Sequence, residues 1–258
     1  MATVSSLLRS TPVRSLLSVW SWLVLGLTII VIVPLVAITR LVTAPFDPGR
    51  YHAGRLFRQI GVIHPLLTPM WKFRVTGEVP ADPRRPYVVV ANHESFVDIL
   101  LICHVPMEMK WMSKTEFFKI PLLGWAMQMA GDIRLDRSDK DARAQALIEC
   151  RDRLDKKVSV MIFPEGTRSQ SGELGEFRDG AFRIAIDAGV PIIPLAVYGT
   201  RDALIKKDWR FGFSDAEVRV LDTISTDGLT EADVPALRDQ TRSVIAAALD
   251  EIRFAREG

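Results

Sequence analysis

The sequence predicts an α/β protein with a central mixed, largely parallel sheet covered by helices, and with an N-terminal pair of membrane-associated helices. Three observations lead to this class. Short apolar runs such as Tyr87–Ala91 and Val158–Phe163 are typical of interior strands. They alternate with amphipathic stretches, and this alternation indicates helices on both faces of a sheet. Ahead of them, Val19–Ile38 is apolar over a length that matches the hydrocarbon thickness of a bilayer when helical.

The apolar run Val19–Ile38 is predicted to be a membrane anchor. Trp20 and Trp22 at its start suit the membrane interface, where an indole keeps its N–H near water. A cleaved signal peptide is the alternative, because Arg9 and Arg14 precede the run. The anchor is favoured because the run is long for a signal peptide and no clean small-x-small cleavage pattern follows it.

The residues after the anchor predict its orientation and a second helix. More basic residues follow the anchor than precede it, and this excess predicts a globular domain on the cytoplasmic face of the cell membrane. These residues are Arg40, Arg50, Arg55 and Arg58. A second apolar stretch, Leu56–Phe73, is interrupted by Pro65 and Pro69. We expect it to form a helix that lies in the membrane interface or packs back on the first segment.

The globular part is expected to begin after the turn-rich stretch Gly77–Pro86. The expected strands are Phe73–Gly77, Tyr87–Ala91, Met109–Met112, Ile133–Leu135, Val158–Phe163, Ile192–Tyr198 and Glu217–Leu221. The expected helices are Val97–Cys103, Leu122–Met129, Asp139–Leu154, Ala181–Ala188 and Glu231–Arg256. We therefore assign residues 1–72 to the N-terminal membrane-associated helices and residues 73–258 to the globular domain.

Composition excludes several classes of protein. With 258 residues, of which 48% are hydrophobic, the chain can bury one full domain and still carry an apolar appendage. The formal net charge of +2 argues against nucleic acid as a partner. The two cysteines, Cys103 and Cys150, are too few for a disulfide framework, and neither has the further ligands that a zinc site needs. No metal site is expected.

His93 and Asp98 are the candidate catalytic pair. They follow the predicted strand Tyr87–Ala91, and parallel strands present catalytic groups at their carboxyl ends. An imidazole titrates near neutral pH, so it can take a proton from an alcohol, and a nearby carboxylate can fix its tautomer. Asp98 could instead be an acid that stabilises a helix N-terminus.

No enzyme nucleophile accompanies this pair. Ser95 lies two residues from His93 but lacks the glycine-flanked turn of a hydrolase nucleophile. The simplest mechanism is therefore direct. The histidine deprotonates an alcohol of the substrate, which attacks an activated acyl group without a covalent enzyme intermediate.

The stretch Phe163–Ser169 is a candidate phosphate site at the end of a second strand. Gly166 allows a close backbone turn, while Thr167 and Arg168 supply hydrogen-bond donors that suit a phosphate. Glu165 would accept from a substrate hydroxyl or hold Arg168 in place. The alternative is a turn with a surface salt bridge. The stretch is not a P-loop, because the second glycine and the Gly-Lys-Ser ending are missing.

Three further segments stay open on residues alone. Arg137, in Gly131–Arg137, could reach the same anion or form an ion pair at a helix cap. Lys114 follows another strand and is a candidate phosphate partner. The segment Val190–Pro194 is predicted to serve packing, with the lining of an acyl groove as the alternative.

These blocks together resemble a known family. Asn92–Asp98, Gly131–Arg137, Phe163–Ser169 and Val190–Pro194 stand in the order of the four blocks of glycerolipid acyltransferases of the 1-acylglycerol-3-phosphate (lysophosphatidate) type. The family blocks are Asn-His-x4-Asp, a Gly-x-Ile-Phe-Ile-Asp-Arg-like block, Phe-Pro-Glu-Gly-Thr-Arg-Ser and Val-Pro-Ile-x-Pro. The resemblance extends from Tyr87 to Tyr198.

The resemblance implies a reaction and roles for the site residues. His93 would be the base for the free glycerol hydroxyl and Asp98 its partner. The glycerol phosphate would be held by Glu165, Gly166, Thr167 and Arg168, with Arg137 and Lys114. The acyl donor would be a thioester, either acyl-CoA or acyl-carrier protein, and the product phosphatidic acid, with no cofactor. The acceptor lysophospholipid and the surrounding membrane lipids would be the partners.

One departure keeps other acceptors open. Arg134 and Leu135 replace an apolar pair of the second family block, and Arg134 adds a charge near the presumed headgroup site. Another lysolipid, an aminolipid or glycerol 3-phosphate therefore stays open as the acceptor. A non-catalytic membrane lipid-binding protein is the alternative from another class.

Overall fold

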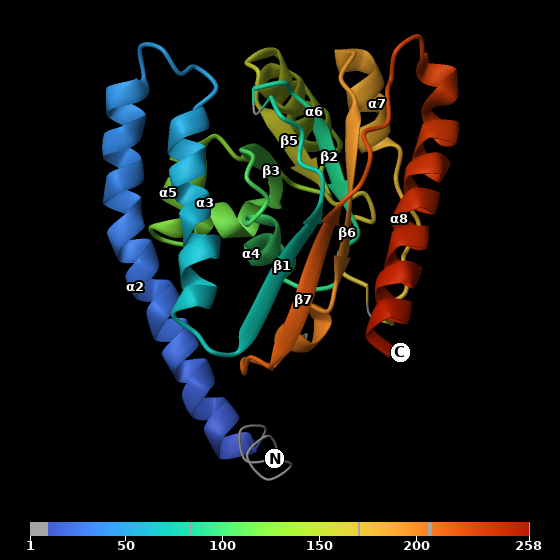
Figure 1. Cartoon of the computed structure of the whole chain (residues 1–258). Coiled ribbons are helices and arrows are strands. Elements are labelled where there is room, and N and C mark those ends of the chain that lie inside the picture. The colour runs from blue at the N-terminus through green and yellow to red at the C-terminus, as the bar shows by residue number, and fades with distance from the viewer. Residues whose placement is uncertain (1–9, 83, 170, 206–207, 258) are drawn as a thin grey trace.

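The computed structural model describes residues 10–82, 84–169, 171–205 and 208–257, and it shows a seven-stranded sheet flanked by helices (Figure 1). The strands are β1 (Trp71–Gly77), β2 (Val88–Ala91), β3 (Met109–Lys114), β4 (Ile133–Leu135), β5 (Ser159–Ile162), β6 (Ile192–Tyr198) and β7 (Ser214–Val220). Their order is β1-β7-β6-β2-β5-β3-β4. Neighbouring strands are parallel except β6 and β7, which are antiparallel. The predicted mixed, largely parallel sheet is confirmed.

Helices cover both faces of this sheet. They are α2 (Thr11–Thr43), α3 (Tyr51–Leu66), α4 (Asp98–Ile102), α5 (Leu123–Ala130), α6 (Lys140–Asp155), α7 (Gly180–Ala188) and α8 (Val234–Glu257). Short 3-10 helices occupy Thr115–Lys119, Arg201–Ala203 and Glu231–Asp233. Strand β2 shows how the faces divide: Val88 and Val90 pack with α6, α7 and α8, whereas Val89 and Ala91 pack with α4.

The expected elements of the globular part are present, with shifts at their ends. The strand expected at Glu217–Leu221 begins earlier, at Ser214. The extension follows from tertiary pairing, because Ser214 to Ala216 lie in parallel register with Trp71 to Phe73 of β1. This segment carries Ser214 and Asp215 and therefore lacks the apolar signal of a strand.

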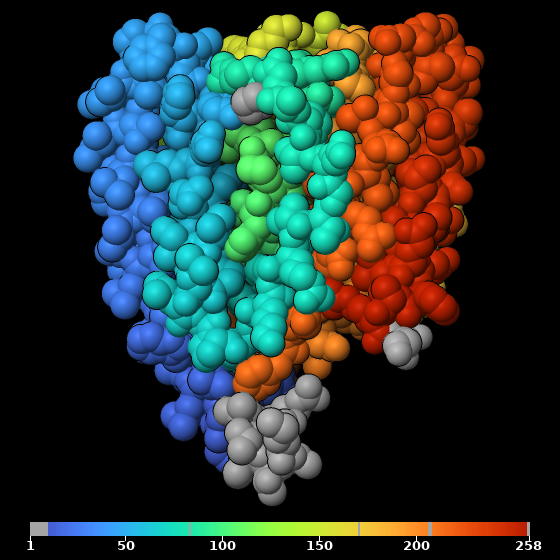
Figure 2. Space-filling view, viewed as in Figure 1, coloured from blue at the N-terminus to red at the C-terminus, as the bar shows by residue number. Residues whose placement is uncertain are grey.

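The N-terminal helices α2 and α3 lie side by side along one flank of the molecule (Figures 1 and 2). Helix α2 contains the predicted run Val19–Ile38 and is long and apolar enough to cross a membrane, by length and composition. One side of α2 packs with α3 and α5 in an apolar cluster. The other side exposes large apolar residues, among them Leu23, Leu27 and Leu41. Arg9 lies outside the described residues.

The expectation of one helix over Leu56–Phe73 is wrong in its second half. Helix α3 ends at Leu66, and Trp71–Phe73 already belongs to β1. Pro69 lies in the connection, where it cannot continue a helix, and pairing with β7 then draws the chain into the sheet. The helical half does pack on α2, as one of the two expected arrangements required.

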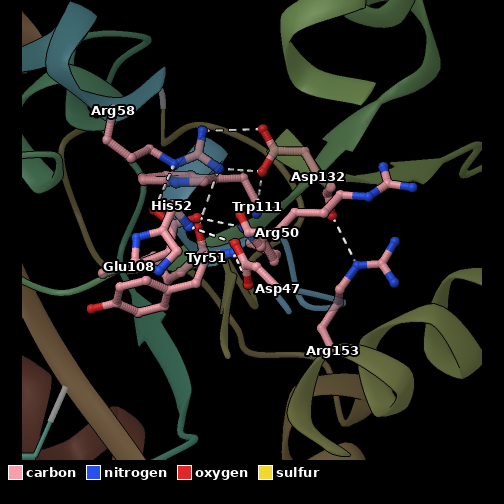
Figure 3. A network of polar contacts seen from close by, with 12 residues as sticks. Asp47, Arg50, Tyr51, His52, Arg58, Glu108, Trp111, Asp132 and Arg153 are labelled. Atoms are coloured by element: carbon pink, nitrogen blue, oxygen red, sulfur yellow. Dashed lines mark hydrogen bonds and ion pairs between the residues drawn. The ribbon is translucent and has the colours of Figure 1, made fainter. Parts of the chain in front are cut away.

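A buried polar network joins α3 to β3 and the start of β4 (Figure 3). The guanidinium of Arg58 donates to both carboxylate oxygens of Asp132, and the Asp132 carboxylate also accepts the backbone N–H of Trp111 at 3.0 Å. The ammonium of Lys110 donates to Glu108 at 2.7 Å. Buried charges require such partners, so this network fixes how the N-terminal helices sit on the sheet.

Candidate active site

His93 and Asp98 form a hydrogen-bonded pair at the carboxyl end of β2. The Nδ1 atom of His93 lies 2.7 Å from Oδ2 of Asp98. The same oxygen accepts the backbone N–H groups of Glu94 at 2.8 Å and Ser95 at 3.0 Å. Asp98 is fully buried, whereas the His93 side chain keeps 15% of its surface exposed. The carboxylate is therefore held as an acceptor, and the far nitrogen of the imidazole, Nε2, has no hydrogen-bond partner among the described residues.

The residues around His93 fix its position from three sides. The side-chain amide of Asn92 exchanges two hydrogen bonds of 2.8 Å with the backbone of Val197 in β6. The backbone N–H of Ser169 donates to the His93 carbonyl at 2.8 Å. The ring of Phe163 stacks on the imidazole, with the ring centroids 3.9 Å apart. The turn after β2 is therefore tied to both β5 and β6.

The Glu165 carboxylate accepts hydrogen bonds from two backbone N–H groups. The expectation that it holds Arg168 in place is not met, because no hydrogen bond or ion pair joins these two described residues. Oε1 of Glu165 accepts the backbone N–H of His93 at 2.8 Å, and its Oε2 accepts the backbone N–H of Gly175 at 3.1 Å. Burial raises the pKa of this carboxyl, while those two hydrogen bonds lower it. Glu165 therefore bridges the His93 turn and the loop before α7.

A cavity of about 300 Å³ lies at the carboxyl ends of β3, β4 and β5 and between α6 and α7. Its walls are mainly apolar and include Met112, Leu135, Leu147 and Ile184. Phe163, which stacks on His93, forms part of the same wall. Three arginines, Arg137, Arg143 and Arg178, complete the lining. The cavity therefore combines an apolar interior with a concentration of positive charge.

Gly166 allows the loop after β5 to approach these arginines. Its φ of +73° lies in the left-handed region that favours glycine. A Cβ atom at this position would lie 3.2 Å from the guanidinium carbon of Arg178. The pKa of Arg137 is lowered by burial and by the positive charge of Arg178. An anion between the two arginines would relieve that repulsion.

The remaining predicted site residues lie around this cavity without lining it. Lys114 is exposed at the end of β3, next to the end of β4. Thr167 is exposed, and Arg168 is half-buried with no hydrogen bond or ion pair to any residue that the structure describes. Arg134 lies over the ring of Phe118 at 5.0 Å, on the sheet face opposite to Leu135. Arg134 therefore lies on the other face of the sheet from the cavity that Leu135 lines.

Val190–Pro194 lies at the opposite end of the sheet from His93. Val190 and Pro191 precede β6 and line a separate cavity with Arg85 and Lys157. Ile192 and Ile193 are fully buried in the core. The packing interpretation is therefore confirmed, and the acyl-groove alternative does not fit this location.

Sequence reasoning missed three residues of the site. Arg143 and Arg178 stand outside the quoted blocks, and no local pattern marks them as neighbours of Arg137. Thr200, whose hydroxyl donates to Oδ1 of Asp98, follows the strand Ile192–Tyr198. A polar residue just after a predicted interior strand is a signal that could have found it.

Both cysteines, Cys103 and Cys150, are free thiols in the structure. Burial raises the pKa of each thiol to about 12, so neither suits a nucleophile.

Comparisons with known proteins agree with this geometry. A sequence model of the family described as Acyltransferase matches residues 72–198. The chain is 35% identical over 211 residues to the chloroplastic 1-acyl-sn-glycerol-3-phosphate acyltransferase LPAT1 of Arabidopsis thaliana, which covers 80% of this chain and 56% of that protein. It is 37% identical over 183 residues to the 1-acyl-sn-glycerol-3-phosphate acyltransferase alpha of Homo sapiens, covering 70% of this chain and 65% of that protein. The chain thus spans less than two thirds of the length of these relatives.

The fold is also similar to a solved structure. The 1-acyl-sn-glycerophosphate acyltransferase PlsC of Thermotoga maritima superposes with a TM-score of 0.79 and 25% identity, over 93% of this chain and 96% of that chain. The blocks Asn92–Asp98, Gly131–Arg137 and Phe163–Ser169 all lie within the range matched by the family model and meet at one edge of the sheet. The chain therefore belongs to the acyltransferase family.

Proposed function

We propose that the chain moves a fatty acyl group from an acyl thioester to the free hydroxyl of 1-acylglycerol 3-phosphate and so makes phosphatidic acid. The single observation that carries this proposal is the His93–Asp98 pair, whose imidazole stacks on Phe163, a wall residue of the cavity that three arginines line. The names of the relatives support the same reaction.

In the proposed mechanism, Nε2 of His93 takes the proton of the acceptor hydroxyl as the oxygen attacks the thioester carbonyl. Asp98 keeps the proton of His93 on Nδ1 and stabilises the imidazolium that forms. The tetrahedral intermediate collapses with cleavage of the carbon–sulfur bond, and the leaving thiolate takes the proton back from His93. The products are the ester and a free thiol, and no metal or cofactor takes part.

The acceptor phosphate is proposed to bind at Arg137, Arg143 and Arg178, with Arg168 and Lys114 as further donors. Guanidinium groups bind phosphate oxygens in pairs, and a phosphate monoester carries close to two negative charges. Burial, and then the positive charge of Arg178, lower the pKa of Arg137, and the second of these causes supports an anion at this position. Gly166 supports it too, because a side chain there would crowd the Arg178 guanidinium. Glu165 acts on the backbone of His93 in this scheme and not on the substrate.

The apolar part of the cavity is proposed to receive an acyl chain. Met112, Leu135, Leu147 and Ile184 offer carbon surface and no charge. Burial of each methylene group there would contribute about 0.8 kcal/mol. The thiol carrier, either CoA or a carrier protein, would remain outside the cavity because it is large and polar.

The membrane arrangement is part of the same proposal. At the N-terminal end of α2, Arg14 donates to the carbonyls of Phe211 at 2.8 Å and Arg210 at 2.9 Å. At the other end, the turn after α2 meets the globular domain, because a Cβ atom at Gly49 would lie 2.7 Å from the side chain of Val158. Because both ends of α2 adjoin the globular domain, the contacts favour a helix lying along one leaflet over a helix that crosses both.

The exposed side of α2 supplies the apolar surface that this arrangement requires. Leu16, Val19, Leu23, Leu27, Val31, Leu35, Ile38 and Leu41 are all exposed along it. They recur every three or four residues, so they form one stripe, which reaches about 38 Å from end to end at the helical rise per residue. We place the protein on the cell membrane with its domain on the cytoplasmic face. Residues 1–72 would serve as the membrane-associated part and residues 73–258 as the catalytic domain.

The experiment that tests the reaction is thiol release from acyl-CoA by the detergent-purified protein, with and without lysophosphatidate. The His93→Ala variant should lose the lysophosphatidate-dependent release, because no other described group takes the proton. The matched control is His52→Ala, whose exposed ring lies on α3 and which should release thiol at the wild-type rate. Undiminished release by His93→Ala would refute the mechanism.

A second acceptor remains the alternative, and a panel of lysolipids separates the two. The arginine cluster favours a phosphate monoester over an aminolipid or a headgroup diester, because the monoester carries more negative charge. Equal rates with lysophosphatidate and a zwitterionic lysolipid would contradict the proposed acceptor. Binding of lysolipid without any thiol release, from acyl-CoA or acyl-carrier protein, would favour a non-catalytic lipid-binding protein.

A further inference from the structure

The Asp98 carboxylate uses its two oxygens for different partners. Oδ2 accepts from Nδ1 of His93 and from the backbone N–H groups of Glu94 and Ser95. Oδ1 accepts from the hydroxyl of Thr200, which follows β6 and lies 102 positions away in the sequence. Thr200 is fully buried. Rotation of the carboxylate about its Cβ–Cγ bond is therefore controlled from both oxygens.

The hydroxyl of Thr200 also contacts a second carboxyl group. Its Oγ1 lies 3.4 Å from Oε2 of Glu94. A hydroxyl carries a single proton and two lone pairs. If that proton goes to Asp98, the contact with Glu94 is a hydrogen bond only when Glu94 is protonated and acts as the donor. The order of donation then runs from Glu94 to Thr200 to Asp98.

The surroundings of Glu94 favour its protonated form. Glu94 forms part of the wall of a polar cavity of about 400 Å³. Three acidic groups lie near the Glu94 carboxyl: Asp98 on α4, Glu173 in the loop after β5 and Asp202 after β6. The basic groups near it are Arg201 after β6 and Arg253 on α8, and His93 is its neighbour in the sequence. Burial, and then the negative charge of Asp98, raise the pKa of Glu94. The backbone N–H groups of Gly199 and Arg201 and the charge of Arg253 lower it by less, and the resulting pKa is about 8.

We propose that Thr200 is a positioning residue of the catalytic pair, and that Glu94 in its protonated form keeps the Thr200 hydroxyl directed at Asp98. This inference rests on the proposed acyl transfer and deepens it. The Thr200 hydroxyl contacts Asp98 and Glu94, and among the described residues it makes no hydrogen bond to His93. It fixes the carboxylate that fixes the imidazole, and Glu94 makes that arrangement sensitive to pH.

Ionisation of Glu94 removes the donor at the start of this chain. The ionised carboxylate then competes with Asp98 for the single Thr200 proton and adds a second negative charge beside it. Asp98 loses its Oδ1 partner in the fraction of molecules where Thr200 turns to Glu94. The rate of the chemical step should therefore decline as the pH rises through the pKa of Glu94.

The test uses three variants of the full-length protein in detergent, assayed for kcat and KM across pH. Thr200→Val keeps the shape but removes the hydroxyl, so kcat should fall roughly tenfold to a hundredfold, as when a hydrogen bond to a charged group is lost. KM should stay within about twofold, because substrate is not touched. Thr200→Ser should restore kcat. Glu94→Gln imitates the protonated acid, so it should retain kcat and lose the alkaline decline.

A second readout separates this inference from the proposed reaction. The Nδ1–H proton of His93 should give a downfield proton NMR resonance that is absent in His93→Ala. It should be unchanged in Thr200→Ser and shifted in Thr200→Val, whether or not lysophosphatidate is the acceptor. Wild-type kcat together with an unshifted resonance in Thr200→Val would overturn the inference. A shifted resonance in a protein without thiol release would sustain the positioning role while the proposed function fails.

Discussion

The ring of Phe163 lies almost flat against the imidazole of His93, with centroids 3.9 Å and planes 16° apart. Phe163 directly follows β5 and begins the block Phe163–Ser169, whereas His93 lies two residues after the end of β2, the neighbouring strand. Phe163 also lines the cavity that contains the three arginines. One aromatic ring therefore forms both the support of the proposed base and a wall of the proposed substrate site.

Replacement of Phe163 by leucine should slow the reaction. A stacked aromatic pair contributes about 0.5–1.5 kcal/mol beyond its buried area, so kcat should fall by roughly two- to tenfold as the imidazole gains freedom. The measurement is the steady-state rate of thiol release with lysophosphatidate. Phe254→Leu is the matched control, since Phe254 is 83% exposed on α8. Equal losses in both variants would contradict a role for the stack.

Replacement of Arg178 by glutamine should weaken binding of the acceptor. Removal of one charged donor to a phosphate costs about 1.5–3 kcal/mol, so KM for lysophosphatidate should rise roughly tenfold to a hundredfold, with a smaller change in KM for acyl-CoA. Initial rates over a range of each substrate check this. Arg183→Gln is the control, because Arg183 is exposed on α7 and pairs with Glu231 away from the cavity. A selective rise in KM for acyl-CoA would place the donor at this site instead.

Replacement of Asp132 by asparagine should destabilise the whole fold. Arg58 would keep its buried charge, and its remaining acidic neighbour, Glu108, lies 3.9 Å away. Removal of one partner from a buried ion pair costs about 3–5 kcal/mol in the free energy of unfolding. Thermal unfolding in detergent measures the effect. Asp136→Asn, on the exposed turn after β4, should unfold near the wild-type temperature. A normal melting temperature for Asp132→Asn would show that the network does not hold α3.

The protonation of Glu94 should appear in the pH dependence of stability. Its pKa is about 8 in the folded chain and near 4.5 as an ordinary glutamate. Between these values the unfolded state binds fewer protons than the folded state. The free energy of unfolding therefore falls as the pH rises through this window and levels off above it. Glu94→Gln lacks this contribution and should gain stability relative to the wild type over the same window.

Denaturant unfolding at several pH values between about 5 and 8 measures the difference between the two proteins. The control is Glu116→Gln, on the exposed 3-10 helix after β3. It should keep a constant offset from the wild type across the window. A constant offset for Glu94→Gln as well would mean that Glu94 ionises normally in the folded protein.

The sequence determined the elements and the centre of the site. The strand Tyr87–Ala91 and the pair His93 and Asp98 after it could be predicted because burial sets hydrophobic periodicity over a few residues, and because parallel strands present polar groups at their carboxyl ends. The turn at Gly166 also has a local signal, since its positive φ favours glycine.

Tertiary structure alone decided which distant groups complete that centre. Thr200 reaches Asp98 across 102 positions, and Glu165 accepts the backbone N–H of His93 across 72. Pairing with β1 turned the polar segment at Ser214 into strand, although its composition favours a turn. Such contacts depend on the order of strands in the sheet. A buried donor or acceptor takes whichever partner the fold brings within about 3 Å, and no local pattern of residues encodes that partner.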